Sequence, residues 1–274
     1  MEITDLYEKS RQIRFEVVKM IAAASSGHPG GSLSEADILA YLYFQEMKID
    51  PCNPAWENRD RFVLSKGHGA PGLYASLALR GYFPVSELAT LRKLHSRLQG
   101  HPDMRKLPGV DFSTGSLGQG FSAACGMAMA GKLDKADWRV YTLIGDGEMQ
   151  EGQIWEAAMS AVQYSLDNLT AFVDYNGLQI DGRNEDVICL GDVCAKWRAF
   201  GWNVIPINGH DMQQIAAAVA SAKQYKGKPT MIVASTIKGK GVSFMEDAVG
   251  WHGSAPNSEQ TEKALSELAC QEVR

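Results

Sequence analysis

The sequence predicts an α/β protein in which a mostly parallel sheet carries helices on both faces. Short apolar runs rich in Val, Leu and Ile lie at 61–65, 139–145, 169–174, 202–207 and 229–237, and helical segments separate most of them. Several runs are apolar along their length, which is typical of strands in a parallel sheet buried on both faces. Glycine-rich turns follow the ends of several runs, where such a sheet leaves room for a ligand.

Residues 139–182 contain the clearest unit of this pattern. A strand ends at Gly145, a helix runs from about Met149 to Leu166, and a second strand covers 169–174. A strand, a helix and a second strand form a βαβ unit, in which both strands run the same way. The carboxyl ends of the two strands therefore meet at one edge of the sheet, which is the edge where α/β proteins bind ligands.

Polar residues after these two strands predict a site for a metal ion and a diphosphate. We expect Asp146 and Asn176 to lie close together, because each follows the carboxyl end of a neighbouring strand. Gly145 and Gly147 let the backbone approach a ligand, and the helix that follows presents an N-terminus that attracts anions. One carboxylate and one carboxamide oxygen suit a hard divalent cation that bridges a diphosphate.

Two other interpretations of this stretch stay open at the level of its own residues. Gly-Asp-Gly also occurs in ordinary strand-to-helix turns, where the aspartate caps the helix. Asp174 ends the second strand and would hold a ribose in a dinucleotide site. However, the glycines at 145, 147 and 152 do not form the Gly-x-Gly-x-x-Gly turn that such a site requires.

The rest of the chain supplies further helices and no sign of a second domain. We find no internal repeat, low-complexity tract or Pro/Ser linker, so a single domain over residues 1–274 is expected. The expected helices cover 4–24, Ser34–Glu46 with Ser34 as its cap, 70–79, 86–95, the small-residue segment after Gly120, 190–200, a segment up to about Tyr225, and a short polar one near the C-terminus.

Composition excludes several classes of function. The net charge of −5 and the lack of a basic stripe argue against nucleic-acid binding. The N-terminus lacks the apolar core of a signal peptide, and no run of about 18 apolar residues is present, so no membrane span is expected. The 5 cysteines are odd in number and lack metal-type spacing, which favours reduced thiols and a cytoplasmic location.

Four of the 6 histidines lie in glycine-rich loops: His28, His68, His101 and His252. Loops placed by a rigid sheet concentrate binding groups, and imidazoles suit proton transfer and hydroxyl recognition. No His-x-x-x-His or Cys-x-x-Cys pair is present, so zinc is not favoured. We expect His95 on a surface helix, and His210 at a helix start where Asp211 is the better cap.

Motifs along almost the whole chain, from about Ile3 to Gly253, resemble those of the N-terminal half of transketolase. They occur in the order of the family. The matching pieces are Ser-Gly-His-Pro-Gly at 26–30, Leu-Ser-Lys-Gly-His-Gly at 64–69, Gly-His-Pro at 100–102, Thr-Gly-Ser-Leu-Gly-Gln-Gly at 114–120, Gly-Asp-Gly-Glu at 145–148, Asn-Gly-Leu at 176–178 and Gly-Trp-His-Gly at 250–253.

The resemblance implies a thiamine diphosphate-binding fold of the type that grips the diphosphate, with Mg²⁺ or another divalent cation such as Ca²⁺ or Mn²⁺. Asp146, Asn176 and the carbonyl of Leu178 resemble the metal ligands, although the family usually has isoleucine at the last position. The resemblance also implies that His68, Gly147, Gly115 and Leu117 contact the cofactor. Asp146 and Asn176 belong to these cofactor contacts as well. His28, His101 and His252 resemble the histidines that line the reaction site. Lys238 falls in a glycine loop near the cofactor, and a solvated basic turn is an equally good interpretation of it.

The chain departs from the resemblance after residue 253, where transketolases continue into a pyrimidine-binding domain with the glutamate that activates the cofactor. This departure implies a split enzyme that is active only with a C-terminal partner subunit, and we expect a heterotetramer with two copies of each chain. The helix after Gly120 is an expected interface. The implied reaction moves a two-carbon ketol unit from a ketose, or ketose phosphate, to an aldose or aldose phosphate.

Three alternatives stay open. One is the α subunit of a thiamine-dependent oxo-acid dehydrogenase and another is half of a deoxyxylulose phosphate synthase, since both keep the Gly-Asp-Gly to Asn motif. A non-catalytic scaffold with the same fold is the third. The His28 loop, His101 and the ending Trp251-His252 favour transketolase.

Overall fold

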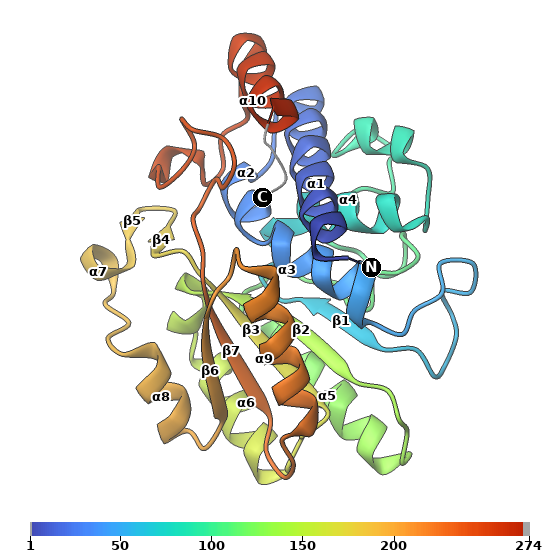
Figure 1. Ribbon diagram of the computed structural model, residues 1–274, viewed down its shortest axis with the longest axis vertical. Helices are drawn as coiled ribbons and strands as arrows, with labels where there is room; N and C mark the ends of the chain where they lie inside the picture. Colours follow the sequence, from blue (N-terminus) through green and yellow to red (C-terminus); the bar gives the residue numbers. More distant parts are fainter. Residues whose placement is uncertain (1, 271–274) are drawn as a thin grey trace.

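The computed structural model describes residues 2–270 (Figure 1). Five strands form the main sheet in the order β1-β2-β3-β7-β6, and every neighbouring pair runs parallel. The predicted class of fold is therefore confirmed. The strands are β1 (Arg61–Leu64), β2 (Val140–Gly145), β3 (Leu169–Tyr175), β6 (Asn203–Asn208) and β7 (Thr230–Ser235).

The central strands are buried on both faces, as their apolar sequences predict. Side chains alternate between the faces along each strand. In β2, Tyr141 and Leu143 belong to one hydrophobic core, whereas Val140 and Ile144 belong to the other. The sheet thus separates two cores, and each core needs its own layer of helices.

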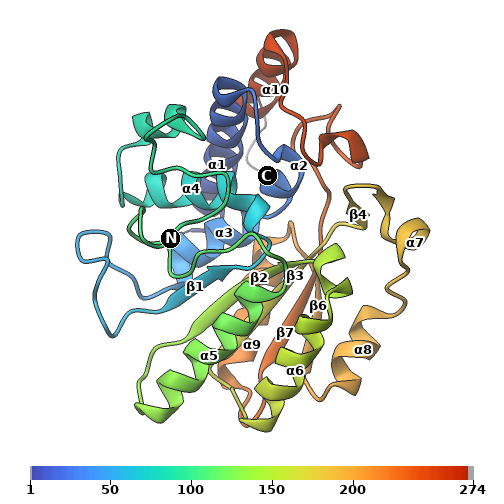
Figure 2. The ribbon, with the colours of Figure 1, turned by 180° about the vertical axis from the view of Figure 1, so that it is seen from behind.

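The helices cover both faces of the sheet, as predicted. Figure 1 shows α9 in front of the sheet, and Figure 2 shows α5 and α6 in front of the opposite face. The first core also includes residues of α1, α3, α4 and α10, and the second includes residues of α8. The bounds are α1 (Ile3–Ala24), α3 (Ala36–Tyr41), α4 (Ala70–Arg80), α5 (Gln119–Leu133), α6 (Gly152–Gln163), α8 (Val193–Ala199), α9 (Met212–Gln224) and α10 (Ser258–Cys270).

The prediction of a single helix from Ser34 to Glu46 is wrong, because the segment starts elsewhere and is divided into separate helices. The structure instead has α2 (Pro29–Ser34), then α3, then a π-helical turn (Leu42–Glu46). Helix α2 begins at Pro29, whose fixed φ favours the first helical position. Ser34 caps nothing, because its hydroxyl donates to the carbonyl of Gly31 and to Asp174.

The prediction of a helix at 86–95 is also wrong. Only a 3₁₀ helix (Val85–Thr90) forms, and Arg92 and His95 then adopt left-handed φ values of 57° and 66°. His95 is exposed, as expected, but in a turn.

Short elements complete the loops at the carboxyl ends of the strands. They are the 3₁₀ helices Gly67–Gly69, Gly147–Gln150 and Val249–Trp251, helix α7 (Asn184–Val187), and the two-stranded pair β4 (Leu178–Gln179) and β5 (Gly182–Arg183). Between residues 2 and 270, no helix is both long and apolar enough to cross a membrane.

Candidate active site at the carboxyl ends of the strands

The turns after β2 and β3 meet, as the parallel arrangement predicts. Asp146 follows β2 and is almost fully buried. Its Oδ1 accepts a hydrogen bond from Gly147 N at 2.8 Å, and its Oδ2 accepts one from Gly177 N at 2.5 Å. One carboxylate therefore joins the two turns, and it brings Asn176, the neighbour of Gly177, to the same edge of the sheet.

Asn176 is held in one orientation by its own turn. Its Nδ2 lies 3.3 Å from Asp174 Oδ2, and its Oδ1 accepts a hydrogen bond from Leu178 N at 3.1 Å. The amide oxygen therefore faces the Leu178 side. The carbonyl of Leu178 accepts a hydrogen bond of 2.9 Å from Lys238 Nζ.

A cavity of about 320 Å³ opens beside these groups. Asp146, Gly147, Asn176 and Leu178 line it on the β2 and β3 side. The residues that complete the wall include His68, Leu117, Lys238 and His252. Most of the cofactor contacts that the resemblance implies therefore share one cavity.

Lys238 is buried, so its interpretation as a solvated basic turn is wrong. Burial lowers the pKa of its ammonium to about 8, against the opposing charge of Asp146. Burial, helped by the charge of Asp174, also raises the pKa of Asp146 to about 6. Both groups are therefore poorly solvated, and each would gain from a ligand of opposite charge.

The four loop histidines come together beside this cavity, which His68 and His252 line. The ring centroids of His68 and His252 are 5.1 Å apart. His28 lies 5.5 Å from His68, 5.7 Å from His252 and 6.4 Å from His101. Loops from distant parts of the sequence thus supply one histidine cluster, defined here as these four residues.

The environment keeps the cluster neutral. Burial lowers the pKa of His28 to about 4, with Arg92 and His101 adding to the effect. Burial and the charge of Lys238 lower the pKa of His252 to about 3. The pKa of His68 lies well below its usual value, mainly through burial. Each neutral ring carries one N–H donor and one acceptor nitrogen, which suits binding of hydroxyl groups.

Gly115 is required for the position of His101. Its φ is 140°, and a Cβ there would lie 2.9 Å from His101 Cγ. The loop that carries Gly115 also carries Leu117, which reaches the cavity. The Gly-rich turn at 114–120 therefore connects the histidine cluster with the cavity.

Two buried polar residues hold this edge together and were given no role from the sequence. The carboxylate of Glu148 accepts hydrogen bonds from Ser65 Oγ at 2.6 Å and from the backbone N of Gly118 and Gly145, both at 2.9 Å. It thereby joins the turns after β1 and β2 to the start of α5. Its place directly after Gly-Asp-Gly was the available signal.

Lys66 is the second of these residues. Its Nζ donates to the Gly31 carbonyl at 2.7 Å and to Asp174 Oδ2 at 2.5 Å, and it lies 2.8 Å from Glu35 Oε2. All three side chains are almost fully buried. Asp174 also accepts hydrogen bonds from Ser34 and Thr236. Because Asp174 is occupied in this way, it cannot hold a ribose, and the dinucleotide interpretation is wrong.

His210 and His95 lie outside the histidine cluster. His210 Nδ1 is 2.7 Å from Asp37 Oδ2, and its Nε2 accepts a hydrogen bond from Ile237 N at 2.8 Å. It therefore links α3 to the segment after β7. Asp211 caps α9 through Gln213 N and Gln214 N, as predicted.

The donors present fit a diphosphate with a divalent cation. No three His, Cys, Asp or Glu side chains in the described part of the chain form a metal site. The expected ligand set instead combines the carboxylate of Asp146, the amide oxygen of Asn176 and the carbonyl of Leu178, all hard oxygen donors.

The fold and this site define an α/β protein that binds its ligand at the carboxyl ends of parallel strands. A profile of the family "Transketolase, thiamine diphosphate binding domain" matches residues 7–272. The chain belongs to the transketolase family, as the thiamine diphosphate binding domain. The resemblance found in the motifs is thus confirmed.

Relatives include both separate subunits and longer chains. The "6-deoxy-6-sulfo-D-fructose transketolase subunit SqwG" of Clostridium sp. (strain MSTE9) is 52% identical over 264 residues, which cover 96% of each chain. An apulose-4-phosphate transketolase subunit of Phocaeicola vulgatus is 43% identical over 98% of this chain and 95% of the relative. The crystal structure of transketolase from Campylobacter jejuni superposes with a TM-score of 0.92 at 36% identity, covering 100% of this chain and 44% of that chain.

Proposed function

We propose that this chain is the diphosphate-binding subunit of a two-chain transketolase. The observation that carries the proposal is the meeting of four neutral histidines beside a cavity that Asp146, Asn176 and Leu178 line. One part of such a site suits a metal and a diphosphate. The other suits the hydroxyl groups of a sugar.

Asp146, Asn176 and the Leu178 carbonyl are the proposed ligands of Mg²⁺, with Ca²⁺ or Mn²⁺ as substitutes. His68 and Gly147 are proposed to hold the diphosphate, and the backbone of Gly115 and Leu117 to contact the thiamine. Lys238 adds a buried ammonium to this set. Thiamine diphosphate, when bound, supplies the carbon nucleophile and electron sink for transfer of a two-carbon ketol unit.

His28, His101 and His252 are proposed to bind the sugar hydroxyls and to move protons during transfer. Their pKa values are lowered, so each ring is neutral at neutral pH. A neutral imidazole accepts a hydroxyl proton at one nitrogen and donates from the other. His252 Nδ1 accepts a hydrogen bond of 2.9 Å from Lys238 Nζ, which fixes the ring and leaves Nε2–H as a donor to a substrate oxygen.

The partner is proposed to be a C-terminal transketolase subunit that carries the pyrimidine-binding domain, in a heterotetramer with two copies of each chain. Support comes from the two relatives named as subunits, which this chain matches over almost their whole length. We also propose a cytoplasmic location, since all five cysteines are free thiols and three of them are exposed. The names of the relatives point to ketoses that bear a phosphate or a sulfonate as donors.

The test uses the chain reconstituted with its partner. Calorimetry with thiamine diphosphate and Mg²⁺ should show metal-dependent binding, and Asp146→Ala should abolish the metal dependence while the circular dichroism spectrum stays unchanged. Asp181→Ala is the matched control, because Asp181 is an exposed carboxylate in the next turn. Metal-dependent binding retained in Asp146→Ala would refute the assigned ligand.

Substrate assays separate the competing functions. The reconstituted pair should convert a ketose with an aldose acceptor. Activity with pyruvate alone would instead favour an oxo-acid dehydrogenase subunit or half of a deoxyxylulose phosphate synthase. Absence of cofactor binding in the wild-type pair would favour a scaffold.

A further inference from the structure

His210 lies outside the histidine cluster, but both nitrogens of its ring are bonded. Its Nδ1 is 2.7 Å from Asp37 Oδ2, and its Nε2 accepts a hydrogen bond of 2.8 Å from Ile237 N. A ring nitrogen that accepts a hydrogen bond from an amide carries no proton, so Nδ1 holds the proton of the ring and donates it to Asp37. The two contacts therefore fix one tautomer and one orientation of the ring.

The carboxylate of Asp37 is itself held by a buried arginine. Arg14 Nη2 donates to Asp37 Oδ2 at 2.5 Å, and Arg14 Nη1 donates to Asp37 Oδ1 at 3.2 Å. Burial alone would raise the pKa of Asp37, but Arg14 and His210 outweigh it and lower the pKa. Arg14 Nε also donates to the Leu33 carbonyl at 3.1 Å, so the acceptor of the His210 proton is fixed between α1 and α3.

The backbone around His210 is held against the end of β7. Gly209 N donates to the Ser235 carbonyl at 2.8 Å, and His210 N donates to Asn208 Oδ1 at 3.0 Å. A Cβ at Gly209 would lie 2.5 Å from Thr236 Cγ2, so only glycine allows this close approach. The turn after β6 therefore carries the His210 ring at a fixed place beside the segment that follows β7.

The amide that donates to His210 belongs to the residue directly before Lys238. Lys238 Nζ is buried in the cavity wall, where it donates to the Leu178 carbonyl and to His252 Nδ1, both at 2.9 Å. Lysine carries its charge at the end of a flexible stem, and burial of that charge costs free energy. The ammonium therefore stays in the wall only if the backbone that carries it is held.

Three hydrogen bonds hold this backbone. Gly239 N donates to the Gly30 carbonyl at 3.0 Å, and the Lys238 carbonyl accepts from Asp247 N at 3.0 Å. These two bonds join backbone groups at and after Lys238. The third bond, to His210, holds the residue before Lys238 and comes from a side chain, so a single substitution can remove it.

We propose that His210 is a positioning residue of the diphosphate site: it holds Ile237 and thereby keeps the Lys238 ammonium in the cavity wall; the inference rests on the proposed function. The contacts run in one series from Arg14 in α1 through Asp37, His210 and Ile237 to Lys238. A diphosphate gains affinity from a charge that is already in place, because less freedom is lost when it binds. The turn after β6 therefore contributes to the site without touching the ligand.

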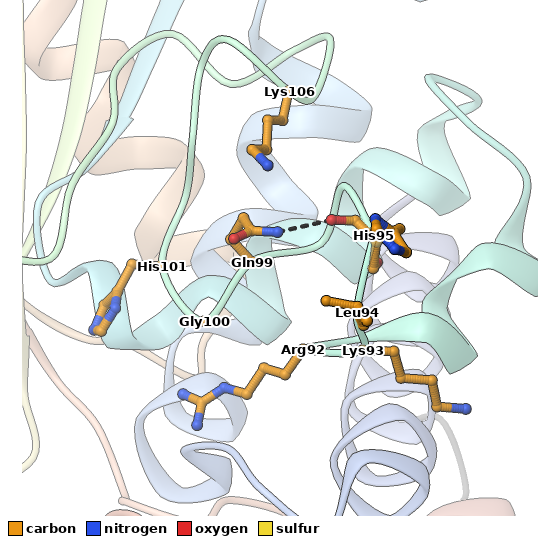
Figure 3. A pocket seen from close by; sticks show the side chains of 9 residues that line it. Arg92, Lys93, Leu94, His95, Gln99, Gly100, His101 and Lys106 are labelled. Carbon is orange, nitrogen blue, oxygen red and sulfur yellow. Dashed lines mark hydrogen bonds between the residues drawn. The ribbon is translucent and has the colours of Figure 1, made fainter.

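The test measures binding of inorganic pyrophosphate with Mg²⁺ to the complex of the chain with its partner, by calorimetry. His210→Leu should weaken binding about tenfold, in line with partial loss of a charge-assisted contact. His210→Gln should weaken it less, because its amide keeps a donor and an acceptor. In a Lys238→Met background, His210→Leu should change the affinity by less than about twofold. His95→Leu is the control and should leave the affinity unchanged, since Figure 3 shows His95 and His101 on opposite sides of Gln99, away from the histidine cluster.

An equal loss of affinity with and without Lys238 would overturn the inference, because a purely structural His210 does not act through that ammonium. No loss in His210→Leu, or no pyrophosphate binding by the wild type, would overturn it as well. His210→Gln gives the same comparison if His210→Leu does not fold.

Hydrogen exchange without any ligand gives a second measurement. The amides of Ile237 and Gly239 should exchange about tenfold faster in His210→Leu, and unchanged exchange at both would overturn the inference. A wild-type complex that binds pyrophosphate but transfers no ketol unit from any ketose would overturn the proposed function, and the comparison with Lys238→Met would still decide the role of His210.

Discussion

Replacement of Lys66 by methionine tests the buried ion pairs that hold the active-site edge together. Lys66 Nζ lies 2.5 Å from Asp174 Oδ2 and 2.8 Å from Glu35 Oε2, with all three side chains almost fully buried. Burial alone would lower the pKa of Lys66, but Asp174 and Glu35 outweigh it and raise the pKa. The ammonium is therefore charged at neutral pH.

The expected loss follows from these contacts. At an effective dielectric constant of about 20, a contact of this length contributes about 6 kcal/mol of attraction. Removal of the ammonium also recovers its own desolvation free energy of several kcal/mol, so breaking a buried pair from one side costs about 3–5 kcal/mol. We expect Lys66→Met to lower the free energy of unfolding by about this amount at pH near 7.

Glu35 contributes less than Asp174 to this loss. Burial raises the pKa of Glu35 to about 8, against the charge of Lys66. Its Oε2 has the Lys66 ammonium at 2.8 Å, and its Oε1 has no hydrogen-bond partner among the described residues. Glu35 therefore holds its proton for much of the time at neutral pH, and Glu35→Gln alone should change stability by less than about 1 kcal/mol.

Urea denaturation of the single and double variants measures the coupling between Lys66 and Asp174. Lys66→Met combined with Asp174→Asn should cost at least about 2 kcal/mol less than the sum of the single variants, since no lone charge stays buried. Lys240→Met is the control, because Lys240 and Glu246 form a partly exposed pair at 3.3 Å that should contribute under about 1 kcal/mol. Additive single losses, or a loss for Lys66→Met as small as the control, would refute the reasoning.

Two further predictions concern pH and backbone conformation. The lowered pKa values of His28 and His252 mean that the unfolded chain binds more protons than the folded chain below the ordinary value of 6.5, so the free energy of unfolding should fall as pH drops from 6.5 toward 4. Denaturation measured at several pH values across that range checks this prediction. His28→Gln should make the free energy of unfolding depend less steeply on pH. An equally steep dependence in that variant would contradict the lowered pKa of His28. Gly239→Ala should cost more than about 2 kcal/mol by thermal denaturation, since φ is 79° and a Cβ would collide with the Met245 carbonyl. Gly227→Ala, at φ 82° with open space around it, should cost only about 1 kcal/mol, and equal losses at both glycines would show that the collision is relieved.

The sequence predicted the structure best where the pattern of neighbouring residues alone specifies the conformation. The strands at 140–145, 169–175 and 230–235 were predicted within about two residues at each end, because short, mostly apolar runs bounded by polar turns leave few alternatives. The proximity of Asp146 and Asn176 followed from topology alone. The four histidines were noticed because glycines surround them, and a histidine in such a loop has no hydrophobic face to pack.

Predictions from neighbouring residues failed where contacts with distant parts of the chain decide the conformation. The segment from Ser34 was predicted as a capped helix, but Ser34 bonds to Asp174, which is 140 residues away in the sequence. The sequence left open whether Lys238 lies near the cofactor or in a solvated turn, and the structure buries its ammonium against the Leu178 carbonyl. The stretch 91–95 was predicted as part of a charged helix, yet the backbone of Arg92 is held by the Leu98 carbonyl and its side chain by Ser26.

The sequence by itself determined the class of fold, the edge of the sheet that carries the site, and the family. It could do so because side-chain periodicity and strand direction are local properties that place the end of every parallel strand on one side. Only the tertiary structure decided the charges at that edge. Within residues 2–270 it brought Lys66 to Asp174, buried Lys238 and made the histidines neutral, because burial and the distance to a partner charge depend on segments that are far apart in the sequence.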